Sequence, residues 1–174
     1  MKKPYEDFRR VTTRLAGYDY AQDGTYFVTL CTQHRQRTLG ILRNGSLAPS
    51  EIGKVAIRNW ESIPDRFPFI LLDTFQLMPD HLHAILSIDR SRSGVRLLQE
   101  VRPGLLDRSQ TNRFGPQRQN LPCVIGAFKA SVKNYANKTG IPFAWQPRYH
   151  EHIIRDAQAL DNIRAYIRNN PLKG

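Results

Sequence analysis

Residues 69–88, FILLDTFQLMPDHLHAILSI, constrain the fold of this chain more than any other stretch. Two apolar runs flank Pro79-Asp80, a dipeptide typical of turns, and they predict two strands joined as a hairpin. Because side chains alternate across a strand, His81 and His83 should project from one face, while the other face takes Leu82, Ala84 and Leu86. Such a strand is a rigid platform for a metal ion, although paired histidines in proteins at large are more often structural.

Two further strands and three helices are predicted around this hairpin. The strands are residues 26–32, which are rich in aromatic and β-branched side chains, and residues 152–155. The helices follow from caps, stop signals and apolar residues at helical spacing, and they run from Ser50 to Pro64, from Pro122 to Gly140 and from Asp156 to Pro171. Residues 33–44 are expected to form a loop or a short hairpin. This order predicts an α+β fold with helices packed on an antiparallel β-sheet.

The length of 174 residues and a hydrophobic content of 40% suit a single domain, residues 1–174. Two basic segments should lie outside its core. Residues 89–121 are dominated by Arg, Gly, Gln, Ser and Pro, which predicts a flexible insertion that either binds nucleic acid or only connects two elements. Residues 1–24 should form a basic arm, whose arginines either contact phosphates or belong to a solvated tail. These arginines are Arg9, Arg10 and Arg14.

The charge of the chain indicates a polyanionic partner. The 26 Lys and Arg against 15 Asp and Glu give a formal net charge of +11 and a pI near 10.1. Basic side chains neutralise phosphates when a protein binds nucleic acid, whereas a basic protein without such a partner is the alternative. Further candidates for nucleic-acid contacts are Lys129, Lys133, Arg148 and Arg155.

The cysteines and the apolar runs indicate where such a protein would work. Cys31 and Cys123 are too few for a zinc finger and are expected to be small buried residues of an intracellular protein. The basic start, MKKPYEDFRR, precedes no apolar signal segment, and no run approaches the ~18 apolar residues of a membrane span. We therefore expect a soluble cytoplasmic protein that acts on neither a membrane nor a small-molecule substrate.

Two polar side chains share one face of the predicted last helix. Tyr166 and Asn170 are four residues apart, so the phenol and the amide should lie one above the other. Because Asn170 precedes Pro171, which disfavours helical backbone before it, we expect Asn170 in a frayed C-terminal turn. Its side chain should still lie near Tyr166.

Three motifs, MPDHLH, WQPRYHEHIIRD and YIRNNP, occur in this order. Together they resemble the REP-associated tyrosine transposases, which are single-tyrosine HUH transposases, over residues 26–171. The resemblance implies the ferredoxin-like HUH fold, with Tyr166 as the catalytic nucleophile. It also implies a catalytic metal ion bound by His81, His83 and Asn170. Nitrogen and oxygen ligands without thiolate favour Mg²⁺ or Mn²⁺.

The resemblance further implies a bacterial, nucleoid-associated endonuclease and strand transferase that is metal-dependent and acts on single-stranded DNA with REP-like hairpins. Tyr166 would form a 5′-phosphotyrosine and free a 3′-hydroxyl, and the reverse attack would rejoin DNA without another cofactor. A monomer is expected, although related insertion-sequence enzymes act as dimers. Two alternatives of another class keep the same fold: a catalytically silent hairpin-DNA-binding protein and an RNA-binding module.

Other residues of the motifs have competing interpretations. Tyr135 is the rival nucleophile, but it falls on the apolar stripe of its helix and is expected in the core. Tyr149 has no amide four residues later. In the second HxH motif, residues 150–152, Glu151 is expected to orient a neighbour or the DNA, or to accept a hydrogen bond from a metal-binding histidine. Trp145 is expected in the core, with base stacking as the alternative.

Overall fold

A four-stranded antiparallel sheet forms the centre of the protein in a computed structural model, which describes residues 20, 22–93 and 119–170. Its strands lie in the order β4-β5-β1-β6, and every neighbouring pair is antiparallel. Their bounds are β1 Gly24–Cys31, β4 Ile70–Leu77, β5 His81–Ile88 and β6 His150–Ile154. The predicted hairpin over residues 69–88 is therefore confirmed as β4 and β5.

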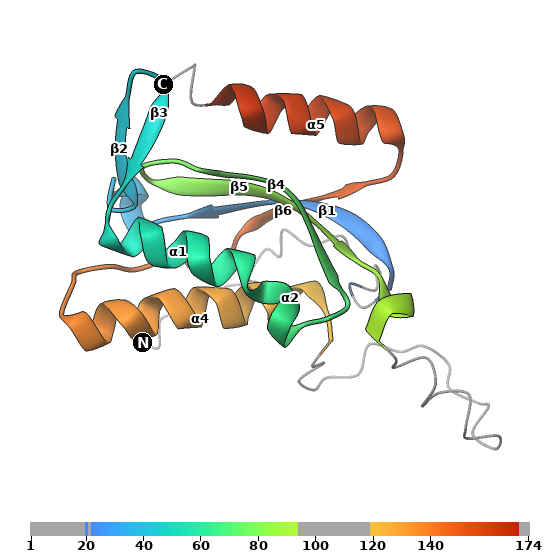
Figure 1. Ribbon diagram of the computed structural model, residues 1–174, viewed down its shortest axis with the longest axis horizontal. Helices are drawn as coiled ribbons and strands as arrows, with labels where there is room; N and C mark the ends of the chain where they lie inside the picture. Colours follow the sequence, from blue (N-terminus) through green and yellow to red (C-terminus); the bar gives the residue numbers. More distant parts are fainter. Residues whose placement is uncertain (1–19, 21, 94–118, 171–174) are drawn as a thin grey trace, which may run out of the picture.

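Helices cover both faces of this sheet, so the predicted α+β class is confirmed (Figure 1). Three helices lie on one face: α1 Glu51–Glu61, α2 Ile63–Arg66 and α4 Leu121–Thr139. The opposite face carries α5, Ala157–Asn169, which packs mainly on β4 and β5. Short 3-10 helices occur at Gln33–Arg35 and Arg90–Ser93.

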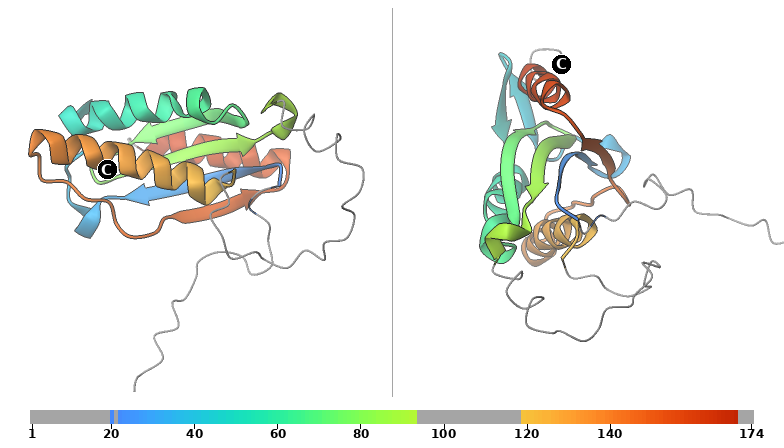
Figure 2. Two further views of the ribbon diagram at one scale, coloured as in Figure 1. Left: turned by 90° about the horizontal axis from the view of Figure 1, so that it is seen from below. Right: turned by 90° about the vertical axis from the view of Figure 1, so that its right-hand side faces the viewer.

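A separate two-stranded hairpin, β2 Gly40–Arg43 and β3 Ser46–Pro49, stands at the same end of the sheet as the C-terminal end of α5 (Figure 2). Its turn residues, Asn44 and Gly45, both have positive φ, as two-residue hairpin turns require. The sequence predicted a loop or a short hairpin for residues 33–44, and the hairpin extends five residues further, to Pro49.

Alternating side chains divide the interior into two unequal parts. The larger core lies between the sheet and α1 and α4, and its fully buried members include Tyr26, Val28, Leu30, Trp60, Leu82, Leu86, Leu121 and Ile125. The smaller core lies beneath α5 and is formed by Ile85, Ile154 and Ile167, with Phe27, Leu160 and Ile163 packed against them. Most of the burial that stabilises the fold is therefore on the α1 and α4 side.

The helix ends follow local chemistry, with one departure from the prediction. Ser50 and Asp156 cap α1 and α5 by accepting hydrogen bonds from the backbone N–H groups of Gly53 and Ala159, as predicted. Gly140 ends α4 in the left-handed conformation, with φ of 71°. The first helix ends at Glu61 rather than at Pro64, because proline is tolerated in a first turn and here lies at the start of α2.

Gly53 allows α1 to approach Leu39, which precedes β2 and is hydrogen-bonded to the turn between β4 and β5. A Cβ atom at Gly53 would lie 2.0 Å from the carbonyl oxygen of Leu39, whose own N–H donates to Pro79. We expect Gly53→Ala to lower the free energy of unfolding by about 3 kcal/mol. The matched control is Gly126→Ala in α4, where a Cβ would meet nothing within 4 Å and alanine should stabilise by roughly 0.5–1 kcal/mol. Urea unfolding of both variants measures the difference, and equal effects would contradict the close approach.

Candidate active site

His81 and His83 project from the face of β5 that α5 covers. Their ring centroids are 4.7 Å apart, and His83 is only 6% exposed. The residues that alternate with them, Leu82 and Ala84, are fully buried in the larger core on the other face. The alternation predicted from the sequence is therefore present, and it turns both imidazoles toward α5.

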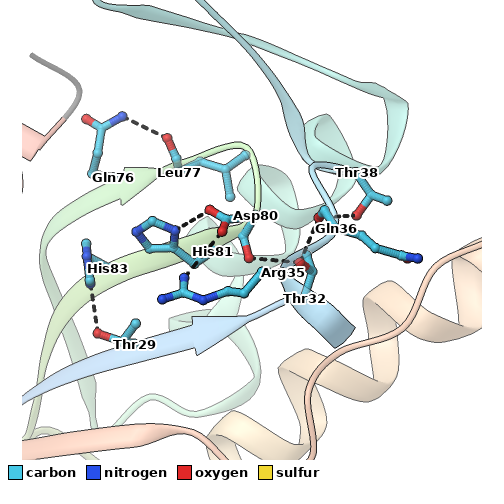
Figure 3. A network of polar contacts seen from close by, with 10 residues as sticks. All are labelled: Thr29, Thr32, Arg35, Gln36, Thr38, Gln76, Leu77, Asp80, His81 and His83. Carbon is cyan, nitrogen blue, oxygen red and sulfur yellow. Dashed lines mark hydrogen bonds and ion pairs between the residues drawn. The ribbon is translucent and has the colours of Figure 1, made fainter. Parts of the chain in front are cut away.

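A hydrogen bond holds each imidazole through Nδ1 (Figure 3). His81 Nδ1 lies 2.6 Å from Asp80 Oδ1, and since a carboxylate only accepts, this nitrogen carries the proton. His83 Nδ1 lies 2.8 Å from the hydroxyl oxygen of Thr29, the residue opposite it on β1. Asp80 in turn forms an ion pair with Arg35, whose Nη1 lies 3.4 Å from Asp80 Oδ2. Holding both rings through Nδ1 directs Nε2 of each toward a ligand, as in metal sites whose histidines have hydrogen-bonded outer partners.

The outer partner expected from the sequence, Glu151, lies on the wrong face. Glu151 pairs with Val28 on β1, whereas the partner of His83, Thr29, pairs with His150. Directly paired residues share a face, so Glu151 turns toward the larger core and His150 and His152 turn toward the α5 side. Both carboxylate oxygens of Glu151 are buried without a hydrogen-bond partner in the part of the chain that the structure describes. The side chains that hydrogen-bond to the two histidines are instead those of Asp80 and Thr29.

Burial keeps His83 neutral. Desolvation, reinforced by the neighbouring His81 and Arg35, lowers the pKa of His83 to about 4, although Asp80 acts in the opposite direction. At neutral pH this imidazole is therefore uncharged, which is the form that ligates metals.

Tyr166 lies against His83, the more buried histidine of the pair. Its ring centroid is 5.4 Å from that of His83 and 6.2 Å from that of Phe27, and both contacts are edge-on. Packing of Ile167 into the smaller core places this turn of α5 over the sheet. Yet 48% of the Tyr166 side chain is exposed, so its hydroxyl is accessible to a substrate. The fold thus brings together residues 83 positions apart in the sequence.

The two rival tyrosines are elsewhere. Tyr135 is half-buried on α4, and its hydroxyl donates to Glu51 Oε1 at 2.6 Å, a hydrogen bond that raises the pKa of the phenol. Tyr149 packs against the larger core on the opposite side of the sheet from Tyr166. Trp145 is buried between Phe128 and Phe143, in line with its predicted place in the core.

Asn170 continues α5 by one residue. The sequence predicted that Pro171 would force Asn170 out of the helical region. This was wrong, because the φ of −61° and the ψ of −43° of Asn170 are helical. Helical geometry keeps its half-buried side chain on the same face as Tyr166, one turn further on.

Sequence reasoning missed a second amide: Gln76 on β4 pairs directly with His83 and therefore shares its face. Only the register of β4 against β5 identifies it.

The donor set of this site suits a divalent cation with mixed ligands. Among the described residues, no three His, Cys, Asp or Glu side chains are arranged to hold a metal ion. Two imidazoles with Nδ1 engaged supply nitrogen ligands, and any further ligand from the described residues must then be of another type, such as the amide oxygen of Asn170 or Gln76.

The residues expected to contact nucleic acid divide into three groups. Arg148 and Arg155 are exposed. Lys129 donates to the carbonyl oxygens of Gln146 and Arg148, and Lys133 donates to that of Phe143, so both ammonium groups hold the chain that leads into β6. The third group, Arg9, Arg10 and Arg14, lies outside the described residues, as does most of the segment 89–121.

A cavity of about 190 Å³ lies beside the histidine pair, on the far side of Thr29. Gln146 and His150 are both hydrogen-bonded or paired to β1, and the residues between them turn away from that strand, with Arg148 at a φ of 75°. The cavity forms in the space that they leave. Its walls are Thr29, Cys31, Gln146, Pro147, Arg148, Tyr149 and His150. Burial raises the pKa of the Cys31 thiol, which agrees with the small buried residue expected there.

Comparisons with other proteins extend over most of the chain. No model of a known protein family matches it. An uncharacterized protein of Haemophilus influenzae is 33% identical over 94% of this chain and 88% of its own length. A second Haemophilus influenzae protein, named "Putative REP-associated tyrosine transposase", is 25% identical over 89% of this chain and 74% of its own length.

The fold is shared with a solved structure. It is that of a REP-associated tyrosine transposase bound to a REP hairpin, with a TM-score of 0.52 and 18% sequence identity. The match covers 91% of this chain and 74% of the other. Separately, none of the helices within the described residues is both long and apolar enough to cross a membrane.

Proposed function

Because the chain belongs to the family of the REP-associated tyrosine transposases, we propose that it cuts and rejoins single-stranded DNA that carries a hairpin, with Tyr166 as the nucleophile. The observation that carries this proposal is the position of Tyr166, whose ring lies 5.4 Å from that of His83. One accessible phenol beside two fixed imidazoles suits attack on a phosphodiester better than any other group of described side chains.

His81 and His83, with the amide of Asn170, would hold Mg²⁺ or Mn²⁺. When bound, this ion supplies positive charge to the scissile phosphate and orients it for in-line attack. The roles of the outer residues follow from their hydrogen bonds. Asp80 keeps the proton of His81 on Nδ1, and Thr29 fixes the ring of His83, so neither imidazole has to reorganise when substrate arrives.

The chemistry proposed for Tyr166 is one displacement at phosphorus. Its hydroxyl oxygen bonds to phosphorus while the bond from phosphorus to the 3′ oxygen breaks, which leaves a 5′-phosphotyrosine and a 3′-hydroxyl. The phenolic proton passes to solvent, which reaches the half-exposed side chain, and the departing 3′ oxygen takes up a proton. Attack by a 3′-hydroxyl reverses the exchange, releases Tyr166 and rejoins the strand.

The part of the same sheet face that α5 does not cover offers a path for the DNA strand. α5 packs mainly on β4 and β5 and also covers Phe27 of β1 and Ile154 of β6, whereas His150 and His152 on this face are exposed. The cavity beyond Thr29 opens at this place, next to the histidine pair. Both halves of the site belong to one chain, which supports action as a monomer.

The test is incubation of the protein with a labelled hairpin oligonucleotide that carries single-stranded flanks, with Mn²⁺, followed by denaturing electrophoresis. We expect a labelled band at the mass of protein plus DNA, which disappears after protease treatment and does not form with excess chelator. Hairpin binding without such a band would contradict the enzyme and favour a catalytically silent DNA-binding protein. Preferential binding of the RNA version of the hairpin would favour an RNA-binding module.

Binding of the hairpin should weaken steeply as salt is added. The chain has a formal net charge of +11, and each phosphate that it neutralises releases counterions. We expect the dissociation constant to rise by about a hundredfold or more between roughly 50 and 200 mM salt. Fluorescence anisotropy of the labelled hairpin measures this, and a flat response across that range would argue against phosphate-driven association.

A further inference from the structure

An irregularity in β4 places an acidic side chain beneath α5. Leu72 pairs with Leu86 and Phe75 pairs with Ala84, so β4 has one residue more than β5 between these pairs. Such a bulge turns side chains away from their regular directions. Asp73 lies in the bulge, and its Oδ1 accepts hydrogen bonds from the backbone N–H and the hydroxyl of Thr74, at 2.6 and 2.8 Å. The carboxylate therefore has a fixed orientation.

Arg164 of α5 binds this carboxylate with two parallel hydrogen bonds. Its Nε donates to Asp73 Oδ1 at 3.1 Å, and its Nη2 donates to Oδ2. Arg164 Nη1 donates to Asp161 on the same helix. The hydrogen bond from Arg164 lowers the pKa of Asp73 to about 2, so the pair is charged throughout the neutral range. Two-point contacts of this kind fix direction as well as distance.

The other contacts of α5 leave its position less defined. In α5 only Ile167 is fully buried, and the smaller core is apolar, so its attraction depends little on the exact placement of the helix. Tyr166 follows Arg164 by two residues, which is a rise of about 3 Å and a rotation of about 200°. Arg164 and Tyr166 belong to the same helix. A movement of α5 along or around its axis that displaces Arg164 therefore displaces Tyr166 relative to His83 by a similar amount.

We propose that Arg164 and Asp73 are positioning residues, whose two-point contact sets α5 so that the Tyr166 hydroxyl meets a phosphate held at His81 and His83. This inference rests on the proposed function for its kinetic consequence. Its structural part, that the contact orders α5 on the sheet, stands independently.

The experiment compares Asp73→Asn with Asp161→Asn, which removes the other partner of Arg164 and leaves the contact to Asp73. For Asp73→Asn we expect the single-turnover rate of adduct formation to fall by about ten- to a hundredfold, since small misplacements of reacting groups have such effects. Hairpin affinity should stay within about twofold, and the melting temperature within about 2 °C, because both partners are partly exposed. Asp161→Asn should match the wild type in all three.

Hydrogen exchange of the α5 amides supplies a readout that needs no activity. Asp73→Asn should speed exchange in α5 and leave β1 and β5 unchanged. The inference is overturned if Asp73→Asn has the rate and the α5 exchange of the wild type, if Asp161→Asn has an equal effect, or if rate and melting temperature fall together. If the wild-type protein forms no adduct, the proposed function fails, and the exchange of α5 alone then decides whether the contact orders the helix.

Discussion

Replacement of Tyr166 by phenylalanine will abolish the covalent protein–DNA product and leave hairpin binding intact. The change removes only the hydroxyl oxygen that would bond to phosphorus, and the ring keeps its edge-on contacts with Phe27 and His83. Because no other described tyrosine lies over the histidine pair, we expect adduct formation to fall at least about a thousandfold. Denaturing electrophoresis measures the adduct, and anisotropy measures binding by the same preparation.

The matched control is Tyr135→Phe, which removes the hydroxyl that donates to Glu51 on the opposite side of the sheet. This variant should form the adduct at close to the wild-type rate, and its stability should change little, because the missing hydrogen bond is exposed to solvent. Adduct formation that survives in Tyr166→Phe and disappears in Tyr135→Phe would refute the assignment of the nucleophile and the site built around it.

Replacement of His81 by alanine will remove cleavage while hairpin binding persists. His81 supplies one of the two imidazoles that would hold the ion. Within the described residues its side chain hydrogen-bonds to Asp80 and contacts the ring of His83, and it is not part of the larger core, so its loss leaves that core untouched. Since charge stabilisation at the phosphate would be lost, we expect a fall in rate of about a thousandfold or more. The single-turnover rate with Mn²⁺ and the hairpin dissociation constant are the two measurements.

His150→Ala is the control for this substitution, because His150 is exposed on the same sheet face and belongs to the second HxH motif. It should keep a rate of cleavage within about tenfold of the wild type, since it would only line the path of the strand. Equal loss of binding and cleavage in His81→Ala, together with a lower melting temperature, would instead indicate that the histidine serves folding.

The sequence predicted the hairpin, the helix caps and the shared face of the two histidines, because each depends on local spacing or on a local hydrogen bond. It did not predict which side chains of β6 turn toward the larger core. Ile153 and Ile154 are adjacent and apolar, so the alternation along the strand is compatible with either set of side chains in that core. The pairing of Glu151 with Val28 shows that Glu151 and Ile153 turn toward it. The hydrogen bond expected from a metal-binding histidine to Glu151 required the opposite face of β6 from the one that Glu151 takes.

The assembly of the site was beyond local reasoning. The contact of Tyr166 with His83 depends on how α5 lies on the sheet, and only the resemblance to a family indicated it. Thr29 could be identified only from the register of β1 against β5, although Asp80 could have been noticed as the residue next to His81 in MPDHLH. The contact between Asp73 and Arg164 depends on a bulge that no sequence pattern marked.

The difference in size between the two cores affects which substitutions this protein can tolerate during evolution. The sheet and the hairpin that carries the histidines are held from the α1 and α4 side, whereas three buried side chains form the core beneath α5. Substitutions at Tyr166 or elsewhere on the exposed surface of α5 therefore threaten the chemistry much more than the fold. Under the proposed function, one substitution at Tyr166 would end DNA cutting and leave a stable scaffold that could be retained for hairpin binding alone.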